Sequence, residues 1–268
     1  MRILDIRECS IPISRYADVH TAPSSLTTSI VAVVTDVVTG DGPVIGYGFS
    51  SFGRFAQGGL IRERFAPRLL RAMPSTLANA EADNLDPFRA WHAMMAGEKP
   101  GGHGERCVAV GTLDMAIWDA AAKIARLPLY RLMAQLLNTH PKAEGVPTYA
   151  AGGYRYPADD VRRLSDEVRS FLDQGFAHVK IKIGATDLRQ DLERIEAVLK
   201  LLHSPDRLAV DAMHTYNREM AMQSAHALQG YGLWWIEDFL DPLDFEGLTQ
   251  LAAGYPWSIA AGESLFSE

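Results

Sequence analysis

The sequence has little cysteine and no long apolar run. Only two cysteines, Cys9 and Cys107, occur among 268 residues. We interpret them as free thiols of a cytoplasmic protein, with a disulfide between them as the less favoured alternative. No apolar run reaches the roughly 20 residues that a membrane-spanning helix needs. The opening residues, MRILDIRECSIPI, alternate apolar and polar side chains with early acids, a pattern unlike a secretion signal.

Positive charge is outnumbered by negative charge, with 26 Lys and Arg against 33 Asp and Glu. The formal net charge is −7 and the sequence pI is about 5.6, which argues against nucleic acid or an anionic membrane as the main partner. Several catalytic motifs are missing as well. The sequence has no Gly-x-Ser-x-Gly elbow and no HExxH zinc motif, and its glycine-rich stretch at 50–59 lacks the lysine of a phosphate-binding loop.

The sequence changes character near residue 140. Its residues are 47% hydrophobic, enough for a sizeable core in one or two domains. A helical pattern extends from 60 to 137, is clearest at 108–125 and is broken by the Gly-Pro segment at 98–105. Three strand-like segments rich in Val and Ile precede it, at 2–11, 28–35 and 43–49. A polar loop is expected at 15–25. We predict an α+β domain over residues 1–140, with an antiparallel meander of three strands.

Residues 141–268 alternate between strand-like and helix-like segments, which predicts a parallel β/α barrel. Helices are expected at 160–174 and 187–202. Strands are expected at 147–151, 177–183, 207–212, 233–237 and 258–262. A complete barrel needs eight strands and about 250 residues. We therefore expect an incomplete barrel of about five strands in a chain truncated at its C-terminus.

Two lysines, Lys180 and Lys182, lie two positions apart in one predicted strand, so their side chains share a face. An isolated pair of this kind is usually solvated. Here Val179, Ile181 and Ile183 are apolar, as expected where helices cover a barrel strand, so the lysines are predicted to face the barrel interior. Neighbouring ammonium groups lower each other's pKa, which would leave one lysine neutral near pH 7 and able to take a proton.

Three acids each close a short apolar run: Asp211 in LAVDAMH, Glu237 in WWIEDF and Glu263 in IAAGES. Each interval is 26 residues, from 211 to 237 and from 237 to 263. A single acid at a strand end is often a helix cap. Three at a constant interval are instead predicted to converge at the mouth of a barrel. Oxygen ligands alone favour Mg²⁺ first and Mn²⁺ second. Asp238 is predicted to point away from Glu237, and His214 is predicted to lie on the surface.

This acid series after a KxK strand, behind an α+β domain, resembles the enolase superfamily in its mandelate racemase/muconate lactonizing branch. The segment AVGTLDMAIWD at 109–119, followed by Lys123 and by PLYRL at 128–132, resembles the capping-domain helix of that branch. Finer features resemble its D-tartrate dehydratases. They are LTTSIVAVVTD at 26–36, GGLIRERF at 58–65, NLD at 84–86, EKPGGHGER at 98–106 and YAAGGY at 149–154.

The resemblance implies a TIM-like enolase barrel behind a capping domain, and a Mg²⁺-dependent hydro-lyase acting on a hydroxy or sugar acid. D-tartrate, converted to oxaloacetate and water, is the leading substrate. Asp211, Glu237 and Glu263 would bind the metal. Lys182 would remove the proton α to the substrate carboxylate, with Lys180 beside it.

The resemblance also implies substrate contacts from Lys99, Ser50 and Tyr149. That branch carries asparagine where this chain has Ser50, Phe52 and Met213, so its polar contacts differ here. The general acid, a histidine of a later strand, would lie beyond Glu268, and the full-length parent would be a homo-oligomer.

Two other interpretations stay open. In one, the same metal and base serve another acid-sugar dehydratase or a racemase of the superfamily. In the other, the chain is an inactive fragment that only binds metal or associates through the exposed edges of an incomplete barrel.

Overall fold

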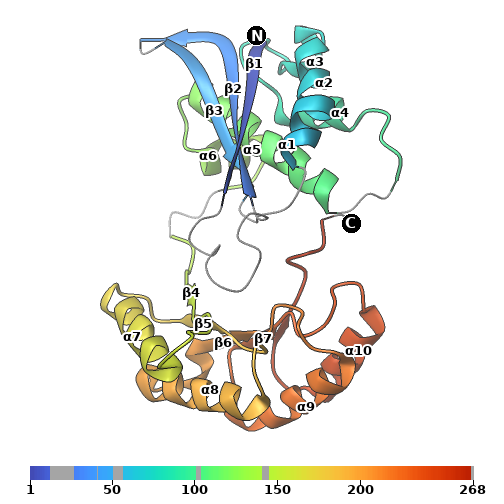
Figure 1. Cartoon of the computed structure of the whole chain (residues 1–268). Coiled ribbons are helices and arrows are strands. Elements are labelled where there is room, and N and C mark those ends of the chain that lie inside the picture. The colour runs from blue at the N-terminus through green and yellow to red at the C-terminus, as the bar shows by residue number, and fades with distance from the viewer. Residues whose placement is uncertain (13–26, 41, 51–56, 101–103, 141–144, 267–268) are drawn as a thin grey trace. The chain divides into compact units, whose positions relative to one another are not determined.

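The computed structural model describes residues 1–12, 27–40, 42–50, 57–100, 104–140 and 145–266 (Figure 1). The chain divides into two compact units, Met1–Ala143 with Phe266–Glu268, and Glu144–Leu265. The loop predicted at 15–25, together with 51–56 and 101–103 of the glycine-rich stretches, lies outside the described residues. Within the described part of the chain, every helix is too short or too polar to cross a membrane. Cys9 and Cys107 are both free thiols.

The first unit opens with an antiparallel sheet of three strands in the order β1-β2-β3, formed by β1 (Ile3–Pro12), β2 (Thr27–Thr39) and β3 (Gly42–Phe49). Val31 and Val33 of β2 are fully buried, because alternate residues of a strand point to the same face. The predicted meander is therefore present, with β2 longer than expected.

Helices cover this sheet, and the longest of them, α5 (Glu105–Ile124), packs on β2 and β3. Leu113, Ile117 and Ala120 of α5 are fully buried in the core of the unit. The other helical segments are α1 (Gln57–Leu60), the π-helical turn η1 (Ile61–Phe65), α2 (Ala66–Arg71), α3 (Pro74–Leu77), α4 (Pro87–Met95) and α6 (Leu129–Leu136). Gly46 and Gly48 of β3 allow close contact, since a Cβ at Gly46 would lie 2.0 Å from the Ala116 carbonyl oxygen.

The second unit holds a parallel sheet of five strands in the order β4-β5-β6-β7-β8. The strands are β4 (Ala150–Gly152), β5 (Val179–Lys182), β6 (Leu208–Asp211), β7 (Trp235–Glu237) and β8 (Ile259–Ala260). Between them lie α7 (Asp160–Asp173), α8 (Leu188–Leu202), α9 (Arg218–Leu228) and α10 (Phe245–Gly254), with short 3₁₀ turns η2 (Pro205–Arg207) and η3 (Gln229–Tyr231). The helices line one side of this sheet in Figure 1.

The register of the parallel strands separates an apolar face from a polar one. Ile181, Val210, Ile236 and Ile259 are direct partners across β5 to β8 and belong to or pack against the buried core of the unit. The residues on either side of each of them point to the opposite face. The mixed α/β fold class predicted from the sequence, an antiparallel cap sheet and a parallel sheet with helices, is confirmed.

Candidate active site

The candidate site is built on one row of residues across the parallel sheet. Lys182 of β5 is the partner of Asp211 in β6, Asp211 is the partner of Glu237 in β7, and Glu237 is the partner of Ala260 in β8. Register partners in parallel strands point to the same side of the sheet. The upper row, as we name residues 182, 211, 237 and 260, therefore gathers one ammonium and two carboxylates at the carboxyl ends of successive strands.

A second row lies two residues earlier along each strand and faces the same side. It holds Lys180, Ala209 and Trp235, which are partners across β5, β6 and β7. We name these three residues the lower row. Its lysine lies beside the upper-row carboxylates, so the two predicted lysines and two of the three predicted metal ligands are neighbours.

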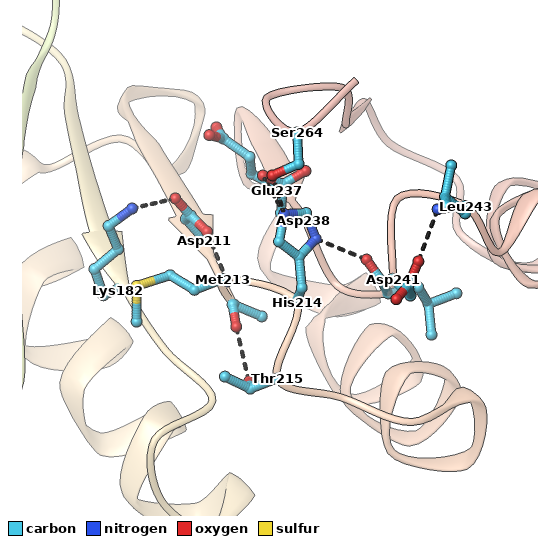
Figure 2. A network of polar contacts seen from close by, with 12 residues as sticks. Lys182, Asp211, Met213, His214, Thr215, Glu237, Asp238, Asp241, Leu243 and Ser264 are labelled. Carbon is cyan, nitrogen blue, oxygen red and sulfur yellow. Dashed lines mark hydrogen bonds and ion pairs between the residues drawn. The ribbon is translucent and has the colours of Figure 1, made fainter. Parts of the chain in front are cut away.

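Both lysines pair with carboxylates. The Nζ of Lys182 donates to Oδ2 of Asp211 (Figure 2), and the Nζ of Lys180 donates to Oε1 of Glu237. Lys180 also lies 3.5 Å from Oδ2 of Asp211. The side chains of Lys180, Lys182 and Asp211 are 8%, 14% and 1% exposed, so Lys182 is the more accessible of the two ammonium groups.

The expected mutual lowering of the lysine pKa values is wrong for Lys180. Burial acts to lower its pKa, but the hydrogen bond to Glu237 and the charges of Glu237 and Asp211 outweigh burial, and the pKa is raised. The sequence argument counted the neighbouring ammonium and missed the carboxylates that the register places opposite each lysine.

Three acids lie close enough to hold one cation. Asp211, Glu237 and Asp238 each offer an oxygen, and these oxygens lie within 4.8 Å of one another. The prediction that Asp238 points away from Glu237 is wrong. Strand β7 ends at Glu237, and Asp238 adopts a left-handed backbone with φ 48°, so the alternation of the strand does not extend to it (Figure 2).

Asp238 carries an unpaired buried oxygen. Its side chain is 3% exposed, and its Oδ1 has no hydrogen-bond partner among the described residues. Burial raises the pKa of Asp238, the nearby His214 lowers it, and the charges of Asp211, Glu237 and Glu263 raise it further. A carboxylate with one unpaired oxygen beside two other carboxylates suits a hard divalent cation, which prefers oxygen ligands. The residues present therefore fit Mg²⁺.

Glu263 is exposed and lies outside the group of three acids that share the 4.8 Å spacing. The row residue of β8 is Ala260, three positions earlier. The constant interval of 26 residues in the sequence therefore does not place Glu263 in register with Asp211 and Glu237 in the sheet. Glu263 is near enough to Asp238 to act on its pKa.

His214 is a site residue that sequence reasoning missed. Its side chain is 24% exposed, and it lies between two strand-end loops, with Nδ1 2.8 Å from the Leu240 carbonyl oxygen and Nε2 3.3 Å from Oδ2 of Asp238. Figure 2 shows the ring beside Asp238 and Ser264. No paired-ligand spacing marks this histidine, so only the fold could reveal it. The adjacent Met213 donates its backbone N–H to Oδ1 of Asp211 at 2.8 Å.

Two tyrosines lie over the two lysines. Tyr149, predicted to contact substrate, directly precedes β4, and Lys180 Nζ lies 5.7 Å from its ring centroid. Tyr149 also packs edge-to-face against Trp234 and Trp235 at 5.8 and 5.2 Å. Tyr154 follows the carboxyl end of β4, is 44% exposed, and its ring centroid lies 5.7 Å from Lys182 Nζ. Tyr154 is thus a second tyrosine to consider for substrate contact.

Ser50 and Lys99 belong to the first unit. Ser50 is buried, and its Oγ accepts from the Ser29 N–H at 3.1 Å. Lys99 is exposed, and its carbonyl oxygen accepts from Arg106 Nη1 at 2.8 Å. Their predicted contact with substrate stays a prediction.

The sequence of the second unit matches a known family. Residues 163–268 match the model described as Enolase C-terminal domain-like. This segment belongs to the enolase superfamily. The resemblance seen in the sequence is thus confirmed at the level of the superfamily, and the finer D-tartrate dehydratase group stays a prediction.

Relatives with named activities include sugar-acid dehydratases. The chain is 32% identical over 253 residues to the L-talarate/galactarate dehydratase of Salmonella typhimurium, a match that covers 94% of this chain and 59% of that protein. It is 30% identical to the arabinonate dehydratase of Saccharolobus solfataricus, over 78% of this chain and 54% of that protein. The chain thus spans less than two thirds of the length of these relatives.

Solved structures share the fold. The L-talarate dehydratase of Polaromonas sp. JS666, complexed with Mg and L-glucarate, superposes with a TM-score of 0.69 at 27% identity, covering 97% of this chain and 65% of that one. A racemase of Streptomyces coelicolor with bound magnesium gives a TM-score of 0.74 at 24% identity, covering 98% and 70%.

Proposed function

We propose that the protein serves as a metal-dependent hydro-lyase for a hydroxy or sugar acid, removing the proton α to a carboxylate and eliminating the β-hydroxyl. The upper row carries this proposal, because it sets a lysine beside two carboxylates at the carboxyl ends of parallel strands. The two dehydratase relatives support the reaction class.

Asp211, Glu237 and Glu263 are the proposed metal ligands, and Mg²⁺ is the proposed metal. Asp238 is an alternative third ligand, since its oxygen lies within the group of three acids and that of Glu263 does not. When bound, Mg²⁺ supplies Lewis-acid stabilisation of the charge that develops on the substrate carboxylate. Magnesium in solved structures of related fold supports this choice.

Lys182 is the proposed base. Its ammonium is more exposed than that of Lys180 and lies at the carboxyl end of β5, where barrel enzymes place catalytic groups. To act, Lys182 must be neutral and released from Asp211. It then takes the α-proton, and the electron pair of the broken C–H bond forms a C=C bond as the β-hydroxyl accepts a proton from a general acid and leaves as water. The enol that results becomes a 2-keto acid. Lys180, tied to Glu237, keeps positive charge beside this centre.

D-tartrate, which this reaction would convert to oxaloacetate and water, is the substrate proposed from the sequence, and Ser50, Lys99 and Tyr149 are the proposed contacts. Larger sugar acids are the main competitors, because the relatives at 32% and 30% identity are named for talarate, galactarate and arabinonate. Cycloisomerisation is a second candidate. It is favoured by 32% identity over 193 residues to the 3,6-anhydro-α-L-galactonate cycloisomerase of Streptomyces coelicolor, covering 70% of this chain and 50% of that protein. We also propose that the full-length protein is a homo-oligomer.

The deciding experiment is a screen of hydroxy and sugar acids in ²H₂O with Mg²⁺. NMR would follow deuterium exchange at the α-carbon, and a keto-acid assay would follow dehydration. We expect exchange and keto acid with one narrow group of acids that includes D-tartrate. Turnover of galactarate or arabinonate without turnover of tartrate would reject the substrate and keep the reaction. A constitutional isomer of the substrate as product would favour the cycloisomerase, and a stereoisomer would favour a racemase. Absence of both exchange and keto acid in the metal-loaded protein would reject the hydro-lyase proposal.

A further inference from the structure

The indole of Trp235 is bonded to the candidate metal ligand Glu237. The two residues lie two positions apart on β7, so their side chains share a face. The Nε1 of Trp235 donates to Oε2 of Glu237 at 2.7 Å, and the other oxygen, Oε1, accepts from Lys180. Both oxygens of this carboxylate are therefore bonded to residues of the lower row, which fixes the direction in which Glu237 points.

The indole ring is itself fixed by packing. Ala209 is the register partner of both Lys180 and Trp235. Tyr149 meets the ring edge-to-face at a centroid distance of 5.2 Å and 79°, and Trp234 lies 4.0 Å away, tilted by 51°. A ring held on two sides cannot turn its N–H away from Glu237 without disturbing this cluster.

We propose that Trp235 is a positioning residue for the metal ligand Glu237, an inference that rests on the proposed function. A carboxylate has about four lone-pair sites, so one hydrogen bond to each oxygen leaves sites for a cation shared with Asp211. Groups that orient metal ligands typically contribute 10–100-fold to metal affinity. The indole N–H thus sets how well Glu237 presents its remaining lone pairs.

The test compares two neighbouring tryptophans in the 268-residue chain. The Kd for Mn²⁺, a probe for the Mg²⁺ site, is measured from the electron paramagnetic resonance of free Mn²⁺. Trp235→Phe keeps an aromatic ring and removes the N–H, and we expect its Kd to rise about tenfold. Trp234→Phe makes the same chemical change in the adjacent ring, which packs on Tyr149 and His178, and we expect a change below about twofold.

Two further measurements separate positioning from packing. Benzothienylalanine at position 235 keeps the shape of the indole without its N–H, so it should reproduce the tenfold loss even if Trp235→Phe folds poorly. In a Glu237→Gln background, Trp235→Phe should change the Kd by less than about twofold, because its effect passes through the carboxylate.

The contrary outcomes are distinct. An unchanged Kd with benzothienylalanine, or equal losses in Trp234→Phe and Trp235→Phe, would overturn the positioning role while leaving the proposed function intact. Absence of saturable Mn²⁺ binding by the unsubstituted chain would overturn the proposed metal site, and the role of Trp235 with it.

Discussion

Lys182 and Asp211 are register partners in adjacent parallel strands, and the ammonium of one donates to the carboxylate of the other. The proposed base is thus paired with a proposed metal ligand. A cation that takes the Asp211 oxygens competes with this ion pair, and a lysine that loses its carboxylate partner loses charge stabilisation. Binding of a metal at Asp211 would therefore be coupled to release of Lys182 through this contact.

The first prediction concerns Lys182→Ala. Exchange of the substrate α-proton in ²H₂O should fall by at least a thousandfold, a loss of about 4 kcal/mol of transition-state stabilisation, because the neighbouring amine of Lys180 is bonded to Glu237 and its pKa is raised. The Mn²⁺ affinity should not weaken, since the substitution removes a competitor for Asp211. Exchange at the unsubstituted rate would remove Lys182 from its proposed role.

The second prediction ranks the acids. Glu237→Gln should weaken Mn²⁺ binding at least tenfold, because a neutral amide replaces a charged ligand that is almost fully buried. Comparing Asp238→Asn with Glu263→Gln then identifies the third ligand. We expect the larger loss from Glu263→Gln if the ligand set implied by the superfamily resemblance operates. The larger loss from Asp238→Asn would assign the site to the three acids that lie within 4.8 Å.

The third prediction concerns Arg194, which is 2% exposed and joins the start of α7 to the carboxyl ends of β4 and β5. It pairs with Asp160 and donates to the carbonyl oxygens of Gly153 and Lys182. Arg194→Leu should lower the free energy of unfolding by about 3–5 kcal/mol, because it leaves buried acceptors unpaired. The matched control is Arg189→Leu on the same helix. Arg189 forms an exposed pair with Glu193, worth less than about 1 kcal/mol. Urea denaturation measures the free energy of unfolding of both variants. Similar losses in the two variants would contradict the stabilising role of Arg194.

The fourth prediction concerns pH. Burial raises the pKa of Asp114 to about 6, against a weaker lowering by the hydrogen bond with Trp118. The folded-state pKa then exceeds the unfolded one, so stability present below pH 4 is lost as the pH rises through 6. Asp114→Asn should be more stable than the unsubstituted chain by about 1–2 kcal/mol at pH 7, less than the full shift implies because Asp114 is partly exposed.

Thermal unfolding across this pH range checks the prediction. The gain of Asp114→Asn should vanish near pH 4. Asp119 of the same helix is the control, since it accepts from the Tyr47 N–H and pairs with Lys123. Asp119→Asn should give no gain at any pH, and a gain equal to that of Asp114→Asn would contradict the burial argument.

The fifth prediction concerns the contact between β3 and α5. A Cβ at Gly48 would lie 2.2 Å from the Thr112 carbonyl oxygen, a backbone atom that cannot move freely. Gly48→Ala should therefore lower stability by about 3 kcal/mol. Gly111 lies on the same helix, and a methyl group added there would have nothing within 4 Å, so Gly111→Ala should raise stability by about 0.5–1 kcal/mol. Opposite signs in a denaturation experiment are the expected result.

Much of the fold follows from local patterns in the sequence. The apolar residues around Lys180 and Lys182 predicted the face of β5 that carries the lysines, because a strand alternates with a period of two. Helix α8 begins after Asp187, whose side chain accepts from the Gln190 N–H. Aspartate is a preferred helix N-cap, so this start can be predicted from the sequence. Periodicity and caps are properties of a few neighbouring residues, so they can be read without the fold.

The rest depends on contacts between distant segments. The left-handed turn at Asp238 is held by backbone bonds, from its own N–H to Ala260 and from the His214 N–H to its carbonyl. No pattern near residue 238 encodes these partners. The position of Glu263 relative to the row depends on where β8 ends, and the raised pKa of Lys180 depends on carboxylates 31 and 57 positions later (at 211 and 237). These features arise only once the strands are paired.

The residues of the upper row share one side of the sheet only while the spacing within each strand is kept. Since the pleat has a period of two, inserting or deleting one residue inside β6 would turn Asp211 toward the helices and bring an apolar neighbour to the open side. Loops after the strands can change length without this penalty, because they lie outside the paired segments. Insertions and deletions in the loops can therefore change the surroundings of the upper row. The number of residues within each strand must be kept for the lysine and the acids to lie together.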